Sequence, residues 1–291
     1  MKNLKILTVL VVLIILISLA VALTGILSSG GSGEFEYMTI RGENVTIYGT
    51  GLYQHMSADV AIQGIAQDIV TVFIGLPFLM LSIYLSYKKN KRGHFILSGT
   101  LGYFLVTYLF YTTMAMYNYM YLAYVALMGL TFFAFVLTLT SYDLDDINQM
   151  LGSTRSLRNG GIFLILNSTM VAFLWLGIVI PPLLDGTLFP DELQHYTTLI
   201  VQGFDLGLLL PMGIVTGILA LKKSRFGTLF LPIYLIFLSI LMAALTSKIL
   251  FMLNAGENVI PVIFIMPTVC VIATLFSIAI LRNVKSINYS A

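Results

Sequence analysis

The chain has 291 residues, of which 58% are hydrophobic and only 10% are charged, and its formal net charge is +2. Soluble globular domains carry about 25% charged residues, so this composition excludes a soluble fold of this size and predicts lipid as the solvent. The charge balance provides no strongly basic surface, and nucleic acid is therefore not an expected partner.

Uncharged apolar runs predict eight membrane spans, because a helix needs about 20 apolar residues to cross a bilayer core. The expected fold is an all-α polytopic membrane protein with a small extracytoplasmic β-hairpin cap. The predicted spans are residues 6–27, 60–87, 95–116, 119–140, 161–184, 197–221, 226–253 and 259–281. The expected domains are an anchor helix (1–27), the cap (28–59), transmembrane helices 2 to 4 (60–140), a cytoplasmic loop (141–160), transmembrane helices 5 to 8 (161–282) and a cytoplasmic tail (283–291).

The first span follows the basic stretch MKNLK and contains AVA, a weak cleavage sequence for signal peptidase. Its apolar core is longer than the 7–15 residues of a signal peptide. The sequence therefore favours an uncleaved anchor, with a cleaved signal peptide as the alternative.

The segment 28–59 opens with the flexible sequence SSGGSG and continues with Thr, Tyr, Ile and Val on both sides of RGEN. This pattern predicts two short strands joined by a turn. Because an isolated hairpin is marginal in water, we expect it to pack on the outer ends of the helices. A lid that gates a ligand is the alternative interpretation.

The basic residues predict the orientation, since cytoplasmic loops carry an excess of Lys and Arg. If both termini are cytoplasmic, only Arg41 lies outside and Lys248 lies within a span. The other basic residues all fall on the cytoplasmic side: Lys2, Lys5, Lys88, Lys89, Lys91, Arg92, Arg155, Arg158, Lys222, Lys223, Arg225, Arg282 and Lys285. The expected location is the cell membrane, with several passes.

Two basic turns share a spacing. Residues 77–93 (PFLMLSIYLSYKKNKRG) and 211–227 (PMGIVTGILALKKSRFG) both read Pro, ten residues, Lys-Lys, three residues, Gly. This spacing suggests a 4+4 parallel internal repeat about an axis along the membrane normal, as in some transporters. The alternative is coincidence, because prolines and basic helix ends are frequent in membrane spans.

Three ionisable residues lie inside predicted spans. Asp68 and Asp205 each lie eight residues inside a helix that enters from outside, which places both carboxylates about 12 Å below the outer boundary. Lys248 lies five residues before the end of the seventh span, at a depth of about 8 Å. Each such group costs about 2.5–3.5 kcal/mol near the bilayer centre, so we expect the three to face one another or water.

Polar and small residues accompany these charges. Gln63 and Gln67 continue one stripe of the second span, and Gln202 lies one turn before Asp205. Small residues are expected to let the helices approach closely: Ala61, Gly64, Ala66, Gly203 and Gly207. The candidate substrate-binding residues are Asp68, Asp205, Lys248, Gln63, Gln67 and Gln202.

Other motifs receive structural interpretations. Tyr117, Tyr119, Tyr121 and Tyr124 are typical of an interfacial aromatic belt, with the lining of an extracellular pocket as the alternative. The positions of Trp175 and Tyr196 also fit the belt. His55 and His195 stand before the second and sixth spans, without the further ligands that a metal or haem site requires. The cluster DLDDINQM fits the start of a short helix better than a Mg²⁺-diphosphate site. No catalytic residue, metal or cofactor is expected.

Several stretches resemble a family of multi-spanning bacterial and archaeal membrane proteins. They are GTGLYQHMS, QDIVTVFIGLP, GTLGYFLVTYLFY, YNYMYLAYVAL and HYTTLIVQGFDLGLLLPMGI. The resemblance covers most of residues 49 to 282. It implies a polytopic helical fold, and no activity, cofactor or site residue is transferred by it.

These observations favour a transporter-like protein that binds, moves or senses a small solute, ion or proton through an outward-facing pocket around Asp68, Asp205 and Lys248. A buried ion network that fixes helix register is the structural alternative for the same residues. A membrane-embedded enzyme acting on a lipid or quinone, with Asp68 or Asp205 as acid or base, is a second functional class. A non-catalytic assembly or scaffold protein is the third.

Overall fold

The computed structural model describes residues 4–114, 116–152 and 155–284, and they are mostly helical. The helices are α1 (Leu4–Leu27), α2 (Ala58–Val70), α3 (Leu76–Tyr87), α4 (Lys91–Thr113), α5 (Tyr121–Leu139), α6 (Leu144–Leu151), α7 (Arg155–Val179), α8 (Pro181–Asp185), α9 (Ile200–Phe204), α10 (Leu210–Leu221), α11 (Arg225–Asn254) and α12 (Val262–Arg282). Strands β1 (Phe35–Met38) and β2 (Asn44–Ile47) form the two-stranded sheet.

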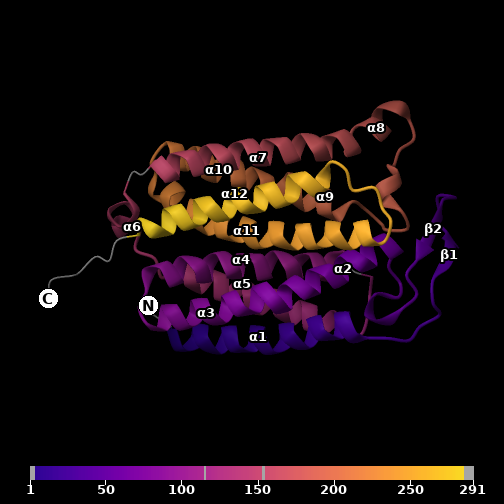
Figure 1. Ribbon diagram of the computed structural model, residues 1–291, viewed down its shortest axis with the longest axis horizontal. Coiled ribbons are helices and arrows are strands. Elements are labelled where there is room, and N and C mark those ends of the chain that lie inside the picture. Colours follow the sequence, from indigo (N-terminus) through magenta and orange to yellow (C-terminus); the bar gives the residue numbers. More distant parts are fainter. Residues whose placement is uncertain (1–3, 115, 153–154, 285–291) are drawn as a thin grey trace.

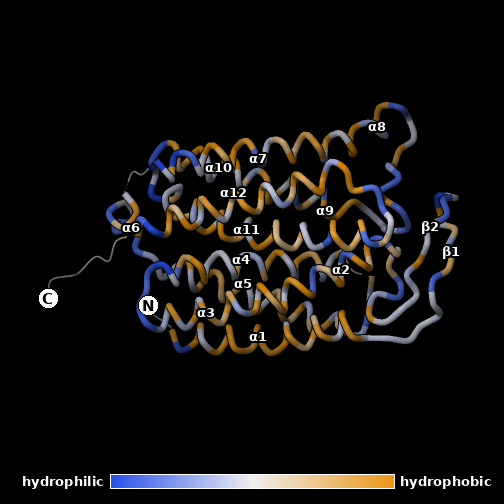
Figure 2. The backbone as a smooth tube through the Cα atoms, in the orientation of Figure 1, coloured by the Kyte–Doolittle hydropathy of each residue, from blue (hydrophilic) through white to orange (hydrophobic). Residues whose placement is uncertain are grey.

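Eight helical segments within these residues are long and apolar enough to cross a membrane, and they agree with the predicted spans. Hydrophobic residues run along the helices, and hydrophilic residues gather at the two ends of the molecule (Figure 2). This arrangement supports a multi-pass membrane protein, as the composition predicts.

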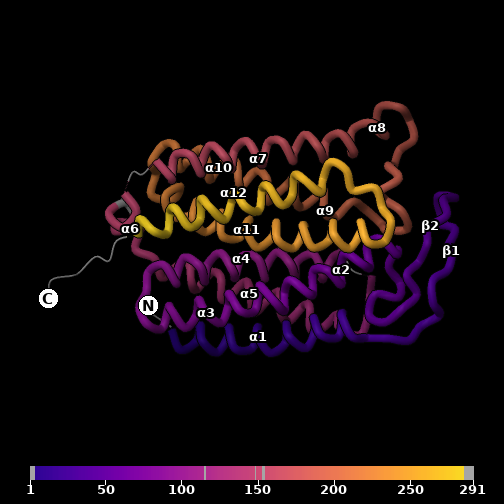
Figure 3. The backbone as a smooth tube through the Cα atoms, in the orientation of Figure 1, coloured from indigo at the N-terminus to yellow at the C-terminus, as the bar shows by residue number. Residues whose placement is uncertain are grey.

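The eight segments pack as two neighbouring four-helix bundles, one from each half of the chain (Figures 1 and 3). In the first bundle α1 packs on α2, α3 and α5, and α4 packs on α3 and α5. In the second bundle α7 packs on α10 and α12, and α11 packs on α10 and α12. The order of packing along the chain is therefore the same in both halves.

The bundles meet mainly where α11 lies against α4 and α2. Gly99 of α4 allows this close approach, because a Cβ at that position would lie only 2.6 Å from Cβ and Cγ2 of Ile236 on α11. Both helices are rich in fully buried residues, so the core of the molecule lies along this contact.

The second and sixth spans each contain a π-helical turn, Thr71–Gly75 between α2 and α3 and Asp205–Leu209 between α9 and α10. A proline follows at the start of the next helix, Pro77 in α3 and Pro211 in α10. Proline has no N–H and its ring crowds the carbonyl four residues earlier, which accounts for a wider turn at this point. Such π turns are frequently found at functional sites.

The cap confirms the predicted hairpin. β1 and β2 pair antiparallel, with Phe35 opposite Ile47 and Met38 opposite Asn44. Arg41, in the turn between the strands, donates hydrogen bonds of 2.9 and 3.0 Å to the carbonyls of Gln194 and Tyr196. The cap from the first half of the chain is thereby attached to the loop that leads into α9.

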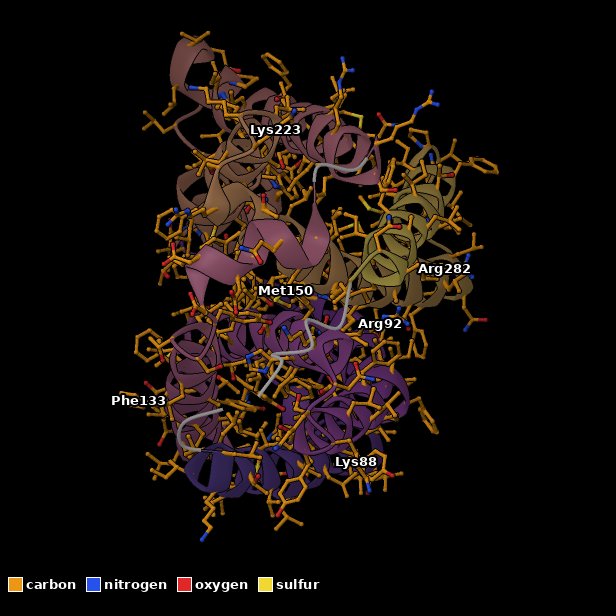
Figure 4. The ribbon with its side chains drawn as sticks, turned by 90° about the vertical axis from the view of Figure 1, so that its left-hand side faces the viewer. Lys88, Arg92, Phe133, Met150, Lys223 and Arg282 are labelled. Atoms are coloured by element: carbon orange, nitrogen blue, oxygen red, sulfur yellow. The ribbon has the colours of Figure 1, made fainter. Side chains whose placement is uncertain are left out.

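The two ends of the molecule differ in charge. We call the end that carries Lys88, Arg92, Lys223 and Arg282 the basic end (Figure 4). The start of α1 and the last turn of α12 lie at this end, and the hairpin lies at the opposite end, the cap end (Figure 1). The short helix α6 crosses the basic end between the two bundles, where Asp145 forms an ion pair with Arg225.

Candidate functional site

The three charged residues predicted to form a site come from α2, the sixth span and α11. Asp68 lies on α2, Asp205 begins the π turn after α9, and Lys248 lies on α11. Asp68 is ten residues beyond the start of α2, whereas Asp205 is only five beyond the start of α9. The equal distance from the helix start that the sequence predicts is therefore not found, and the equal depth in a membrane stays a prediction.

Asp68 is held in a cage of phenol groups. Its side chain is only 2% exposed. Oδ2 accepts a hydrogen bond of 2.5 Å from the hydroxyl of Tyr53, and Oδ1 accepts one of 3.0 Å from the hydroxyl of Tyr111. Hydrogen bonds to a carboxylate are stronger than those between neutral groups, so these two donors stabilise the buried acid, which forms no ion pair within the described residues.

The donors reach Asp68 from different parts of the fold. Tyr53 belongs to the short 3₁₀ helix Gly51–Tyr53 of the cap, and Tyr111 belongs to α4. Burial and the neighbouring Asp68 carboxylate raise the pKa of Tyr53 well above its ordinary value. The Tyr53 hydroxyl therefore keeps its proton and acts as the donor, and the cap contacts the carboxylate directly.

The first helix closes another side of the cage. A Cβ at Gly25 of α1 would lie 1.8 Å from Oδ2 of Asp68 and 3.0 Å from the Tyr53 hydroxyl. Only a residue without a side chain leaves room for the carboxylate here. The helix that begins the chain, whether interpreted as an anchor or a signal sequence, is thus a wall of the site.

Asp205 accepts a hydrogen bond from an indole group. Nε1 of Trp175, on α7, donates a hydrogen bond of 2.8 Å to Oδ2 of Asp205. Asp205 is half-buried, in contrast to the fully buried Asp68. The two acids therefore occupy different surroundings, one enclosed by hydroxyl groups and the other beside an indole.

Lys248 acts on both acids without touching either. It is half-buried, and it attracts the carboxylates of Asp68 and Asp205 electrostatically. Within the part of the chain that the structure describes, its Nζ makes no ion pair shorter than 4.0 Å. The adjacent Ser247 instead donates a hydrogen bond of 3.3 Å to the Ala66 carbonyl, which joins α11 to α2.

The three predicted glutamines divide between two environments. Gln67 is buried and donates to the Tyr103 hydroxyl at 2.7 Å and to Thr107 at 3.3 Å. Its amide therefore links α2 to α4 and is not directed at Asp68. Gln63 and Gln202 are half-buried, and their side chains make no hydrogen bond among the described residues.

Aromatic residues form a larger part of the site than the sequence suggests. Tyr53, Tyr111 and Trp175 supply the donors to the two acids. Tyr124, predicted for the interfacial belt, is only 1% exposed and packs edge-on against Tyr111. That prediction is wrong for Tyr124, because the inner face of α5 turns it toward the bundle.

The two histidines before the second and sixth spans do meet, through a backbone atom. His195 Nε2 lies 3.1 Å from the carbonyl oxygen of His55. In the described ranges no group of three or more His, Cys, Asp or Glu side chains is placed to hold a metal ion. The contact therefore joins the cap to the loop before α9.

Comparisons with protein-family models, with curated proteins and with solved structures find no match for this chain. The function of the site is therefore inferred from its geometry and its charges.

Proposed function

We propose that the protein binds, moves or senses a small cation or a proton through a polar site at the cap end, formed by Asp68, Asp205 and Lys248. One observation carries this proposal. Lys248 attracts both carboxylates and contacts neither of them. The three charges therefore interact, and direct ion pairing among the described residues does not neutralise them.

The charge balance favours a cationic ligand. Two carboxylates and one ammonium leave one negative charge uncompensated when all three are ionised. An unbalanced charge inside a membrane is costly, and such residues usually line ion, proton or substrate pathways. A proton or a small cation would restore neutrality, whereas an anion would add to the imbalance.

The cap supplies a means of controlling access. Tyr53 covers Asp68 from the outer side and is itself only 2% exposed. In the proposed pathway, a ligand from the cap end reaches the carboxylate when this phenol moves away. The lid interpretation of residues 28–59 is thus supported by a contact between the cap and the buried acid.

The direct test is ion flux in vesicles that contain the purified protein and a dye for H⁺, Na⁺ or K⁺. We expect flux of one of these cations above that of empty vesicles. Asp68→Asn and Asp205→Asn should each lower it by about tenfold, equivalent to 1.4 kcal/mol of lost interaction. The matched control is Asp191→Asn, the same change at an exposed residue of the cap end.

Two results would count against a cation pathway. One is wild-type protein that conducts none of the three cations and whose thermal stability is unaffected by any of them. The other is flux that both Asn variants leave at the wild-type rate.

A structural role is the second candidate, because a specific observation favours it. Asp68 and Asp205 both accept hydrogen bonds from neutral donors on other elements. Such contacts fix helix register even when the charges add little net stability. In a scaffold the two Asn variants would change thermal stability, and cation flux would be absent in every variant.

The orientation and the repeat belong to the same proposal. The positive-inside rule places the basic end in the cytoplasm, with both termini there and the cap outside the cell membrane.

Five paired features support a 4+4 parallel repeat: the π turns, the following prolines, Lys89 and Lys223 at positive φ, the helix caps Asn90 and Ser224, and the packing of Gly93 and Gly227 on Leu85 and Leu219. Counted from these prolines, Asp68 corresponds to Gln202 and Asp205 to Thr71.

Cysteine labelling tests both the proposed orientation and the proposed repeat. In a Cys270→Ser background, Lys88→Cys and Lys222→Cys place exposed thiols at equivalent positions of the two basic turns, and Glu34→Cys places one in the cap. A membrane-impermeant maleimide added to intact cells should label only position 34. Labelling of position 88 or 222 from outside would exclude the proposed orientation, and labelling of only one of the two would also exclude a parallel repeat.

A further inference from the structure

Three consecutive residues of the second half join the two halves of the chain at the cap end. They are Gln194, His195 and Tyr196, which follow the 3₁₀ helix Asp191–Leu193 in the loop that leads into α9. Arg41 donates from the hairpin turn to the first and third of their carbonyls, and the loop lies beside the hairpin (Figure 1). We call residues 194–196 the latch.

The latch also holds the start of the second span. Gln194 Nε2 donates a hydrogen bond of 3.0 Å to Oδ2 of Asp59, in the first turn of α2. The backbone N–H of Ser57, the residue that precedes α2, donates to the Tyr196 hydroxyl at 3.2 Å. The Ser57 hydroxyl lies 3.2 Å from the same oxygen. The latch therefore joins the cap-end entrances of the two spans that carry the acids of the proposed site.

Gln194 is strained while these contacts are made. Its φ of 49° and ψ of −129° are close to those of the first central residue of a type II′ turn, a position that glycine usually occupies. A side chain with a Cβ is strained in this conformation, and such strain persists only where the surrounding structure imposes it. Here Arg41 and Asp59 of the first half impose it. Release of the latch would therefore relieve the strain.

The entrance of the sixth span has little buried surface of its own. No residue of α9 is fully buried, whereas five residues of α2 are. The ring of Phe204 packs edge-on against Phe110 of α4, with 5.7 Å between the centroids. Asp205 and Gln202 are half-buried. Segments with few buried contacts open locally at a low free energy, so the hydrogen bonds of the latch have a large influence on whether this entrance is open.

We propose that the latch is a gate for the site at Asp205. In the closed state its hydrogen bonds to Arg41, Asp59 and Ser57 hold the entrance of the sixth span against the cap and α2. Their release lets this entrance move away, relieves the strain at Gln194 and admits a small cation from the cap end. The inference rests on the proposed function for the ligand alone, because the opening itself needs no ligand.

Thiol labelling of the purified full chain in detergent measures this opening without a ligand and without ion flux. In a Cys270→Ser background, Gln202→Cys places a reporter one turn before Asp205, and a charged, water-soluble maleimide reacts with it faster when the latch is open. Glu34→Cys, at an exposed position of the cap, gives the rate of a freely accessible thiol. We expect the reporter to react well below that rate while the latch is intact.

Two variants weaken the latch from opposite sides. Arg41→Ala should raise the labelling rate of the reporter at least fivefold, because it removes two hydrogen bonds from a charged group. Tyr196→Phe keeps the ring and removes the hydroxyl that contacts Ser57, and we expect an increase of about threefold. Ile40→Ala is the matched control in the same hairpin turn, since Ile40 is 92% exposed. It should leave the rate unchanged.

A second reporter separates gate opening from a general loosening of the fold. Thr216→Cys lies on α10, where Thr216 is 5% exposed, and its labelling should remain slow in every variant. The gate is overturned if the first reporter reacts as fast as Glu34→Cys from the start, if either weakening variant leaves its rate unchanged, or if both reporters accelerate alike. Absence of ion flux in the wild type contradicts the proposed function, whereas unchanged labelling in a protein that conducts contradicts the gate alone.

Discussion

Replacing Gly25 with alanine is expected to lower the free energy of unfolding by about 1–3 kcal/mol, the usual effect of overpacking. The new methyl group would lie 1.8 Å from Oδ2 of Asp68, so α1 or the carboxylate must shift. Either movement disturbs the hydrogen bond from Tyr53, which is 2.5 Å long. Thermal unfolding in detergent measures the change in stability.

Two further variants separate this contact from a general effect of alanine. Gly129 of α5 has no atom within 4 Å of where its Cβ would lie, so Gly129→Ala should be neutral or stabilising, because alanine favours the helix. Asp68→Ala removes the group with which the Gly25 methyl collides. The double variant should therefore be more stable than the sum of the two single changes predicts, by about 0.5–3 kcal/mol. If the stability changes of the two single variants simply add in the double variant, Gly25 does not form a wall of the site.

The spans and the hairpin were predictable because each rests on a local pattern. Eight apolar runs of sufficient length define the helices, and Thr, Tyr, Ile and Val on both sides of RGEN define β1 and β2. The sequence also identified three candidate site residues, because a charged residue within an apolar run is rare. They are Asp68, Asp205 and Lys248. Their hydrogen-bond partners could not be predicted, because these partners come from other helices and from the cap.

Aromatic residues illustrate this limit. Trp175 and Tyr124 lie within predicted spans, and the sequence alone assigns both to an interfacial belt. In the structure Trp175 donates to Asp205, and Tyr124 lies in the interior. Which side of a helix faces a neighbour decides between the two interpretations, and almost uniformly apolar sequences carry little helical periodicity from which to read it.

Small residues show the same limit. Gly64 was expected to allow close packing, and the ring of Tyr53 does lie about 3.1 Å from where its Cβ would be. Gly203 and Gly207 were expected to do the same, and neither has an atom within 4 Å of that position. Gly25 has the closest contact with the site and lies in a helix far from Asp68 in sequence. A glycine indicates that close approach is allowed and does not identify the neighbour.

Replacing Lys248 with methionine is expected to lower the free energy of unfolding by about 1–3 kcal/mol. Methionine has a similar length and no charge, so the change leaves two carboxylates without the cation that attracts both of them. The effect should be smaller than that of breaking a contact ion pair, because Lys248 touches neither acid. Lys222→Met, the same change at an exposed lysine, should have no measurable effect.

Charge compensation distinguishes an electrostatic role from packing of the lysine chain. Adding Asp205→Asn to Lys248→Met removes one of the two uncompensated acids. We expect this second change to restore about 1 kcal/mol of the lost free energy of unfolding. Asp68→Asn should recover less, since an amide in that cage offers a single oxygen to the hydroxyls of Tyr53 and Tyr111. If neither second change recovers stability, the lysine acts through its packing, and the three residues do not share one ligand site. Asp205→Asn is then compared with Asp68→Asn by the stability that each restores to Lys248→Met. If Asp205→Asn restores more, Asp205 is the acid whose charge responds to a bound cation. Asp68 is then the acid whose hydrogen bonds the cap already satisfies.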